Sequence, residues 1–591
     1  MIKIKRPQRL LFLPVLLASG LGLAFADQVP DEDVVFKALG DELKRSMSLR
    51  LEDLDQPYFI QYAVDDSITY RISATQGGLL SSDQSRSRVL HSQVRVGSYE
   101  LDNSNFTGRG DAGGRRGLSG STELPTDDDY MALRQAIWLA TDSQYKDAVE
   151  ALTQKRAYMR DRTIEDRPRD FTRTDGVTAI KDRVKFSFDR AKWEDYTRRL
   201  SAQFGEYRNI QDSGVSLTAG AEDRYLVNSE GARLRYGDTG VLLRITAEAQ
   251  ADDGERLSDQ LVYYSISPAQ LPAIADVLAD VKKLADRLAA AIKAPILEDY
   301  TGPVLFDGLA SAQLFRQLLA RGIAGQPDSV GSQRRGPVGT DDLENRLDKR
   351  ILPATFQIYD DPRGEKFQGA FLAGHYLFDD EGIPAQRVEI VADGKLQGMV
   401  MSRAPTKHFT QSNGHGRRGG GESPRSAIGC LYIESTKGES LEDLKKELID
   451  AAEAEGLKYG LRITAIQGRP AGGPGGAGGR GGGRGGGRGG FGGGGASRVI
   501  GDPISIYKVY VADGREEPVR GCEFSAVDVR SLRKIIAAGN VPTVHNSAGG
   551  TSPASSVIAP AVLFEEMELS PIKQEAEKKP ILEAPHARRN R

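Results

Sequence analysis

Cysteine, histidine and tryptophan are scarce in this sequence: its 591 residues include two cysteines, six histidines and two tryptophans. The two cysteines, Cys430 and Cys522, are too few for a disulfide framework, so the hydrophobic core must stabilise the fold. We expect two buried free thiols, with a disulfide between them as the alternative. The net charge is only −3, so the overall charge indicates neither nucleic acid nor an anionic membrane as the partner.

Long apolar runs are missing after the N-terminus, where no stretch approaches the ~18 apolar residues of a membrane-spanning helix. The N-terminus has basic residues between Lys3 and Arg9, an apolar run over 10–23 and a small-x-small signal at 24–26. This pattern is typical of a secretory signal peptide over 1–26, with a single membrane anchor as the alternative. The protein is therefore predicted to be exported to the periplasm or the extracellular space, with no membrane segment after cleavage.

Familiar catalytic patterns are missing as well. The six histidines form no H-x-x-x-H pair, and no G-x-S-x-G elbow occurs. A histidine on a predicted strand, such as His375, is more often a hydrogen-bonded structural residue than a metal ligand. A catalytic Ser, Asp and His that only folding brings together would not be found by such a search for motifs.

Glycine is abundant, with 67 residues, and it dominates 468–497 together with Arg480, Arg484 and Arg488. Such a segment cannot bury enough apolar area to offset the entropy lost on ordering, so 468–497 is predicted to be a flexible insertion. The alternative is an RGG-type nucleic-acid segment with Phe491 as a stacking ring. The predicted export argues against that alternative, so nucleic acid is not the expected partner.

Hydrophobic periodicity predicts an α+β protein with two domains. The first domain, 27–295, combines long helices with an antiparallel sheet. Its helices are predicted over 31–50, 128–160 and 271–292, and a polar surface loop is predicted over 103–127. Short strands are predicted from Tyr58 onwards, and the Asp65-Asp66 pair and Gly77-Gly78 are predicted to separate them.

The second domain is predicted to span 301–569 and to be rich in β-structure. Alternating residues indicate strands over 371–377, 386–391 and 397–401. A helix is predicted over 441–454, with Ser440 as its N-cap. The charged, proline-bearing tail, 570–591, is predicted to be disordered.

The stretch 301–326 predicts a short buried strand, an Asp307-Gly308 turn and a helix over 309–321. This stretch, the Asp-Asp-Glu-Gly turn at 379–382 and the loop at 413–418 together resemble the TldD/PmbA family of zinc metallopeptidases. In catalytic TldD-type members the helix is similar to L-H-E-x-x-x-H-G, with two zinc-binding histidines and a general-base glutamate. On that pattern, Arg316 and Arg321 occupy the histidine positions and Gln317 the glutamate position.

The resemblance implies an α/β N-terminal domain and a β-rich C-terminal domain that carries the site. Family members assemble from two subunits around a cavity and act on small or unfolded peptides. Their third zinc ligand is a cysteine near the C-terminus, in a segment where this chain has His545, Asn546 and Ser547.

The replaced residues cannot perform the zinc chemistry that the resemblance implies. Arginine has no lone pair to donate to a metal, and glutamine cannot take a proton from water. No zinc and no other cofactor is therefore expected. Arg316 and Arg321 are either solvated or salt-bridged, or they line the cavity that holds zinc in catalytic members and there bind an anion such as a peptide carboxylate. From the loop at 413–418, His415 and Arg417 are further candidates for substrate binding.

The sequence thus predicts an exported TldD/PmbA-family protein that serves as a non-catalytic peptide-binding or partner subunit. Its expected ligand is a peptide or small protein, and it is expected to form a homodimer or to pair with another subunit of the family. The alternative is an active peptidase, dependent on a metal through other residues or free of metal.

Overall fold

A computed structural model describes residues 33–50, 54–107, 119–160, 162, 166–331, 343–419, 423–468, 500–549 and 552–572. The predicted signal peptide, nearly all of the glycine-rich insertion and most of the predicted tail lie outside these residues. The predictions for those three segments therefore stay predictions.

The first half of the chain forms a seven-stranded sheet in the order β3-β2-β1-β5-β6-β4, with β7 also paired to β6. All pairs are antiparallel except β4 with β6. The strands are β1 (Pro57–Thr75), β2 (Gly78–Val96), β3 (Ser119–Glu123), β4 (Thr178–Ile180), β5 (Ile210–Asn228), β6 (Arg233–Gln250) and β7 (Arg256–Ser265).

The Asp65-Asp66 pair does not form a turn, so two predicted short strands are one continuous strand, β1. Asp65 pairs with Arg418 at 2.5 Å and Asp66 pairs with Arg88 at 2.6 Å. Because both carboxylates have a guanidinium partner, they are tolerated inside a strand.

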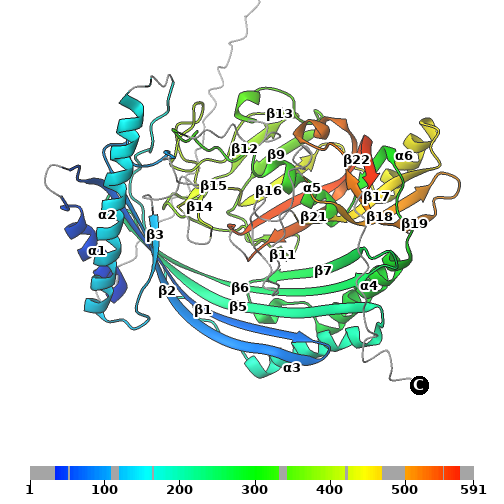
Figure 1. The fold of residues 1–591 in the computed structure, drawn as a ribbon, viewed down its shortest axis with the longest axis horizontal. Helices are drawn as coiled ribbons and strands as arrows, with labels where there is room; N and C mark the ends of the chain where they lie inside the picture. Colours follow the sequence, from blue (N-terminus) through cyan, green and yellow to red (C-terminus); the bar gives the residue numbers. More distant parts are fainter. Residues whose placement is uncertain are drawn as a thin grey trace, which may run out of the picture.

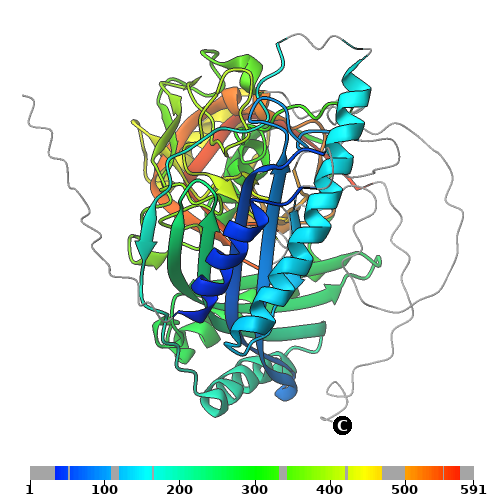
Figure 2. The same cartoon turned by 90° about the vertical axis from the view of Figure 1, so that its left-hand side faces the viewer.

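Four helices cover the outer, convex side of this sheet, as Figures 1 and 2 show. Apolar residues of α1 and α2 pack on one end of the sheet, and those of α3 and α4 pack on the other. The side chain of Asp33 caps α1 by accepting from the backbone N–H of Phe36 at 3.1 Å. The helices are α1 (Val34–Ser46), α2 (Tyr130–Arg160), α3 (Arg190–Ala202) and α4 (Ile274–Lys293), with short 3-10 turns at Gln203–Glu206 and Pro268–Gln270.

The second half forms an eleven-stranded mixed sheet whose main path is β13-β12-β9-β16-β22-β8-β17-β18-β19. β20 and β21 pair with the long strand β22, and the β16–β22 and β17–β8 pairs are parallel. Its strands are β8 (Tyr300–Phe306), β9 (Phe356–Asp360), β12 (Val388–Ala392), β13 (Lys395–Leu396), β16 (Cys430–Ser435), β17 (Tyr459–Ile466), β18 (Pro503–Tyr510), β19 (Glu516–Val519), β20 (Cys522–Phe524), β21 (Ile535–Ser547) and β22 (Ser555–Pro571).

Two helices, α5 (Leu309–Leu319) and α6 (Leu441–Ala454), pack on this sheet. The predicted N-cap of α6 is confirmed, because Ser440 Oγ accepts from the backbone N–H of Asp443 at 3.1 Å. Smaller elements complete this half: β10 (Lys366–Phe367), β11 (Ala370–Phe371), β14 (Gly416–Arg417), β15 (Arg425–Ser426), and 3-10 turns at Leu343–Arg346 and Val529–Lys534.

The second half lies on the concave side of the first sheet (Figure 1). Phe378 packs among apolar residues of the first half, and Gln61 Nε2 donates to the carbonyl of Asp380 at 3.0 Å. Arg403 and Glu230 form a buried ion pair at 2.6 Å across the same junction. The turn at 379–382 and the segment around Arg403 therefore join the two halves.

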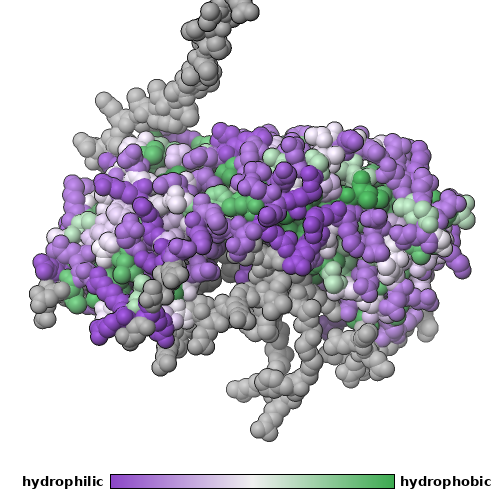
Figure 3. Space-filling model, turned by 90° about the horizontal axis from the view of Figure 1, so that it is seen from above, coloured by the Kyte–Doolittle hydropathy of each residue, from purple (hydrophilic) through white to green (hydrophobic). Residues whose placement is uncertain are grey.

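The face seen in Figure 3 is mostly hydrophilic, with hydrophobic side chains in small separate groups. Among the described residues, no helix is long and apolar enough to cross a membrane. Cys430 and Cys522 are both buried and unpaired, which confirms the expectation of two free thiols.

Three predictions of local structure are wrong. Asn103 and Ser104, at the start of the surface loop predicted over 103–127, are buried, and Ser104 donates to the carboxylate of the preceding Asp102. Of the strand predicted over 371–377, only Phe371 belongs to a strand, β11. The strand predicted over 397–401 does not form, because the side chain of Asn413 bonds to the backbone of Met399 and Met401 in place of a neighbouring strand. The tail begins later than residue 570, because β22 continues to Pro571.

Candidate functional site

The helix that carries the replaced motif, α5, follows β8 through the predicted Asp307-Gly308 turn. Gly308 has a positive φ of 54°, and Asp307 Oδ1 accepts from its N–H at 2.6 Å. Ala312, Phe315 and Leu319 lie at helical spacing and are buried in the core of the second half. The helix ends at Leu319 rather than at residue 321, so Arg321 lies in the turn that follows. The direction of its side chain is therefore not set by the 100° step per residue of an α-helix.

Arg316 is half-buried and has no ion pair among the described residues. Its Nε is buried without a hydrogen-bond acceptor, and burial lowers the pKa of its guanidinium. The charge of Arg316 also acts on His545 of β21. Burial first, and then this charge, lower the pKa of His545 to about 4. The fold therefore brings the replaced motif next to the C-terminal segment, as the resemblance implied.

Gln317 is a structural residue. Its Nε2 donates to the carbonyl of Gln467 at 3.0 Å, and its Oε1 accepts from the N–H of Gly501 at 2.8 Å. These two residues stand on either side of the glycine-rich insertion. The amide therefore binds both ends of that insertion to α5, and it needs its donor as well as its acceptor.

Arg316 and Arg321 line the same pocket, which has a volume of about 430 Å³. Arg417 lines it too, and we call it the arginine pocket. Of the described residues around it, none is acidic. The full lining is Arg316, Ala320, Arg321, Ala324, Gln326, Arg417, Gly419, Ser423, Arg425, Ser426, Ala427, Ile428, Ser552, Pro553 and Ser555.

Arg417 is held rigidly at the wall of the arginine pocket. Its side chain is 7 % exposed and its guanidinium carbon lies 3.9 Å from the centre of the Tyr376 ring. Nε is 3.4 Å from Asp380 Oδ2, but Nη1 is buried with no partner among the described residues. Buried donors are almost always satisfied in proteins, so Arg417 is a candidate donor to a ligand.

His415, in contrast, does not line the arginine pocket and is no longer a candidate for substrate binding. Its side chain is fully buried. Nε2 lies 3.0 Å from Asp360 Oδ1, and Nδ1 lies 2.9 Å from the carbonyl of Asn413. Because both ring nitrogens have partners inside the fold, His415 orders the loop that leads to Arg417.

Asn546, one of the three residues in the segment where family members have the ligand cysteine, is held by the backbone of the second half. Asn546 Nδ2 donates to the carbonyl of Phe371 at 2.8 Å, and its Oδ1 accepts from Ala373 at 3.0 Å. Successive side chains of a strand point to opposite faces. A cysteine at position 546 would therefore point away from the face on which His545 meets Arg316.

These residues do not fit a zinc ion. Among the described residues, no group of three or more His, Cys, Asp or Glu is placed to bind a metal. His545 is the imidazole that the permanent charge of Arg316 reaches. A dication there would meet one ligand and a like charge instead of three ligands.

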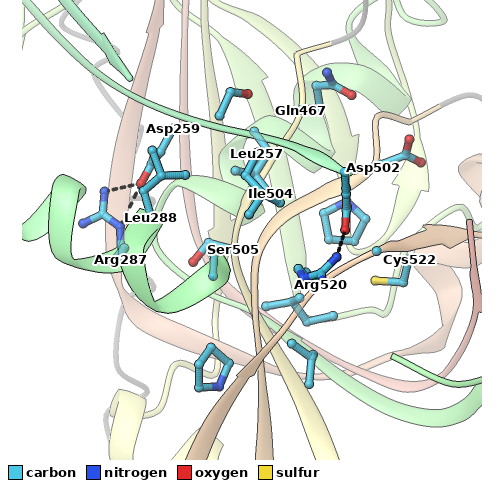
Figure 4. Close-up of a pocket in the computed structure, with 18 of the residues that line it drawn as sticks. Leu257, Asp259, Arg287, Leu288, Gln467, Asp502, Ile504, Ser505, Arg520 and Cys522 are labelled. Atoms are coloured by element: carbon cyan, nitrogen blue, oxygen red, sulfur yellow. Dashed lines mark hydrogen bonds and ion pairs between the residues drawn. The ribbon is translucent and has the colours of Figure 1, made fainter. Parts of the chain in front are cut away.

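A second pocket in the seam between the two halves, of about 140 Å³, is shown in Figure 4. Its charged residues are largely paired with one another: Asp259 with Arg287 at 2.8 Å, and Glu255 with Arg520. Its small volume and these pairs leave little room or charge for a ligand.

Sequence reasoning missed Arg425 and the serines of the arginine pocket. Ser423, Ser426, Ser552 and Ser555 line it together with Arg425. They come from two segments more than a hundred residues apart, and no motif joins them. Only the local enrichment in Ser and Arg near 423–426 was available as a signal.

Comparisons with known proteins agree with this geometry. Residues 299–469 match the PmbA/TldA metallopeptidase C-terminal domain. A protein named metalloprotease from Archaeoglobus fulgidus is 30% identical over 118 residues, which cover 20% of this chain and 26% of that protein. Another metalloprotease, from Synechocystis, is 27% identical over 203 residues, which cover 34% of this chain and 40% of that protein. The matched region thus spans well under half of each relative.

Three solved structures share the fold over most of this chain. TldE from Thermococcus kodakarensis has a TM-score of 0.55 at 13% identity, covering 90% of this chain and 100% of that one. A candidate DNA gyrase modulator from Bacteroides thetaiotaomicron has a TM-score of 0.56 at 15% identity, covering 90% and 99%. Another from Thermotoga maritima has a TM-score of 0.52 at 15% identity, covering 86% and 96%.

The fold, an antiparallel sheet with long helices followed by a mixed β-rich half, is shared with TldE and with the two candidate gyrase modulators. The chain thus carries the C-terminal domain of the PmbA/TldA metallopeptidases at 299–469, within a fold that TldE and the candidate gyrase modulators share.

Proposed function

We propose that this chain is a non-catalytic, peptide-binding member of the family that holds an anionic group of its ligand in the arginine pocket. The observation that carries the proposal is the convergence of Arg316, Arg321 and Arg417 on one pocket without a described acidic residue. Two of these arginines have buried N–H groups without acceptors.

A carboxylate fits these donors better than a neutral group does. Arginine presents its N–H groups as a planar fork that matches a carboxylate, and such charge-assisted bonds are about twice as strong as neutral ones. Burial of Arg316 without a partner is unfavourable for the free protein, and a bound anion would relieve that cost. A peptide C-terminus or an acidic side chain supplies such an anion.

Hydrolysis is not part of this proposal, because the same residues remove its chemistry. Gln317 is engaged with the backbone on both sides and has no basic atom for activating water. The alternative, an active peptidase, is favoured by the names of the two metalloprotease relatives. Peptide cleavage that a chelator abolishes would support that alternative and exclude the non-catalytic function.

Export and pairing are parts of the same proposal. The signal over 1–26 predicts a mature protein that begins at Asp27, and N-terminal sequencing of secreted protein tests it. The resemblance to the TldD/PmbA family, whose members assemble from two subunits, supports a role as one subunit of a pair. Light scattering of the mature protein, alone and with another family member of the same source, tests whether it pairs.

The binding experiment uses rhodamine-labelled octapeptides of mixed sequence, as the free acid and as the C-terminal amide. Fluorescence anisotropy should show the acid pool binding at least about tenfold more tightly than the amide pool. Arg316→Met should remove this preference. The control variant, Arg208→Met, changes an exposed arginine away from the arginine pocket and should keep it. Equal binding of acid and amide by the unmodified protein would exclude the proposal.

A further inference from the structure

A third pocket adjoins the arginine pocket on the concave side of the first sheet. We call it the trough pocket, and it has a volume of about 580 Å³. β1, β5, β6 and β7 form one wall, and the segment around residues 365–377 forms another. The two halves of the molecule thus enclose it together.

The trough pocket and the arginine pocket share a wall. Arg417 lines both of them. The segment before β22 also lines both, with Ser552, Pro553 and Ser555 on the arginine pocket and Ala554 on the trough pocket. A ligand of several residues could therefore occupy both pockets by passing Arg417.

One corner of the trough pocket is acidic and aromatic. Asp238 and Glu365 are exposed to it, and among the described residues neither forms an ion pair. Both carboxylates act on Tyr264, whose pKa rises to about 12 through burial, with Asp238 and Glu365 adding to the rise. An aromatic ring beside two carboxylates is a suitable environment for an ammonium or guanidinium group.

The other charges of the trough pocket are mostly accounted for. Glu222 pairs with Arg224, and Arg224 also lies 3.7 Å from Asp380. Lys181 lines the pocket as well, and the charge of Arg224 acts on Tyr264 in the direction opposite to the two carboxylates. Charge therefore changes sign along the pocket, from Arg417 with its unpartnered Nη1 to the corner of Asp238 and Glu365.

We propose that the ligand is a peptide that combines an anionic end with a basic side chain a few residues away. Its carboxylate binds in the arginine pocket, its backbone passes Arg417, and its lysine or arginine side chain enters the trough pocket between Asp238, Glu365 and the ring of Tyr264. This inference rests on the proposed function, and it adds a second point of recognition that determines which peptides bind.

The test uses rhodamine-labelled octapeptides that carry lysine or norleucine at one of the four positions before the C-terminal residue. Each peptide is made as the free acid and as the amide. For the free acid we expect lysine to bind about tenfold more tightly than norleucine at one of these positions. Norleucine has the same length as lysine without the charge, so the comparison isolates the charge.

Protein variants assign the two preferences to the two pockets. The double variant Asp238→Asn/Glu365→Gln should reduce the preference for lysine to less than about twofold and keep the preference for acid over amide. Arg316→Met should remove the preference for acid. Asp212→Asn, at an exposed position of β5 outside both pockets, is the matched control and should keep both preferences.

Each failure is distinguishable. A preference for acid without a preference for lysine, or a preference for lysine that survives in Asp238→Asn/Glu365→Gln, overturns this inference and leaves the proposed function standing. The absence of both preferences in the unmodified protein overturns the proposed function and this inference with it.

Discussion

Arg316 is needed for the proposed ligand binding but lowers the stability of the free protein. Its guanidinium is half-buried and its Nε has no acceptor among the described residues. A buried polar group without a partner costs about 1–3 kcal/mol. We therefore expect Arg316→Met to raise the free energy of unfolding by about that amount. Urea denaturation measures it, with Arg208→Met as the exposed control. A less stable Arg316→Met variant would mean that Arg316 has a partner that stabilises the fold.

His545 supplies a prediction about pH. Burial and the charge of Arg316 lower its pKa to about 4, against about 6.5 in an unfolded chain. The unfolded state therefore binds a proton that the folded state does not bind, and the free energy of unfolding falls by about 3 kcal/mol as pH falls from about 6.5 to 4. In Arg316→Met the NMR-measured pKa of His545 should move up towards 6.5. An unchanged pKa would show that the Arg316 charge does not reach the ring.

At the same scale, the sequence predicted which residues stand at the motif positions but not what each one does. The helix was predicted to reach residue 321, but α5 ends at Leu319, and Arg321 lines one pocket with Arg316 from the turn that follows. The partners of Gln317 and His415 are backbone groups and a carboxylate from distant segments. Sequence spacing carries no information on such contacts, because folding alone creates them.

At the scale of the element, α5 is fixed to the sheet by its glutamines as well as by its apolar face. Gln313 Oε1 accepts from the N–H of Ile466 at 2.9 Å, one helical turn before Gln317 binds Gln467 and Gly501. Gln317→Glu would replace the donor that faces the Gln467 carbonyl with a carboxylate oxygen. We expect a loss of about 1–3 kcal/mol in the free energy of unfolding. Thermal and urea unfolding measure this loss.

A Gln317→Glu variant of unchanged stability would contradict this role for the amide. Gln317→Leu is a useful companion, because it removes both bonds without adding a charge and should cost less than Gln317→Glu. The order of the two variants therefore separates the lost hydrogen bonds from the repulsion between the two oxygens.

Elements with strong local signals were predicted well, and those that depend on partners were not. α6 matches its predicted range because its apolar spacing and its Ser440 cap are both local. β1 was divided in two, because acidic residues within a strand are stable only beside Arg88 and Arg418, which lie elsewhere in the chain. The strand predicted over 397–401 fails for the same reason, since Asn413 takes the place of a neighbouring strand.

At the scale of the whole molecule, the two halves are joined by buried charges. Arg403 is fully buried, and it donates both to Glu230 at 2.6 Å and to the carbonyl of Thr172 at 2.6 Å. Arg403→Met would leave Glu230 without its charged partner, and we expect a loss of about 3–5 kcal/mol. Calorimetry should show a lower Tm, and the two halves should no longer unfold together. An unchanged Tm would mean that apolar contacts alone hold the halves together.

The α+β class and the family could be predicted from the sequence, because they depend on periodicity and on the order of several short motifs. The pockets could not be predicted. The trough pocket needs the concave face of one half placed over the turns of the other, and the arginine pocket needs α5, β14 and the segment before β22 to converge. Both depend on packing between segments that lie hundreds of residues apart in the sequence.

We propose above all that this protein has the fold of the TldD/PmbA metallopeptidases but binds no zinc. The most direct test is the zinc content of the mature protein after dialysis against zinc and then against metal-free buffer, measured by mass spectrometry. We predict far less than one zinc per chain, and peptide binding that a chelator does not change, because Arg316 and Arg321 replace two ligands. One tightly held zinc per chain, together with peptide cleavage that a chelator abolishes, would contradict the account.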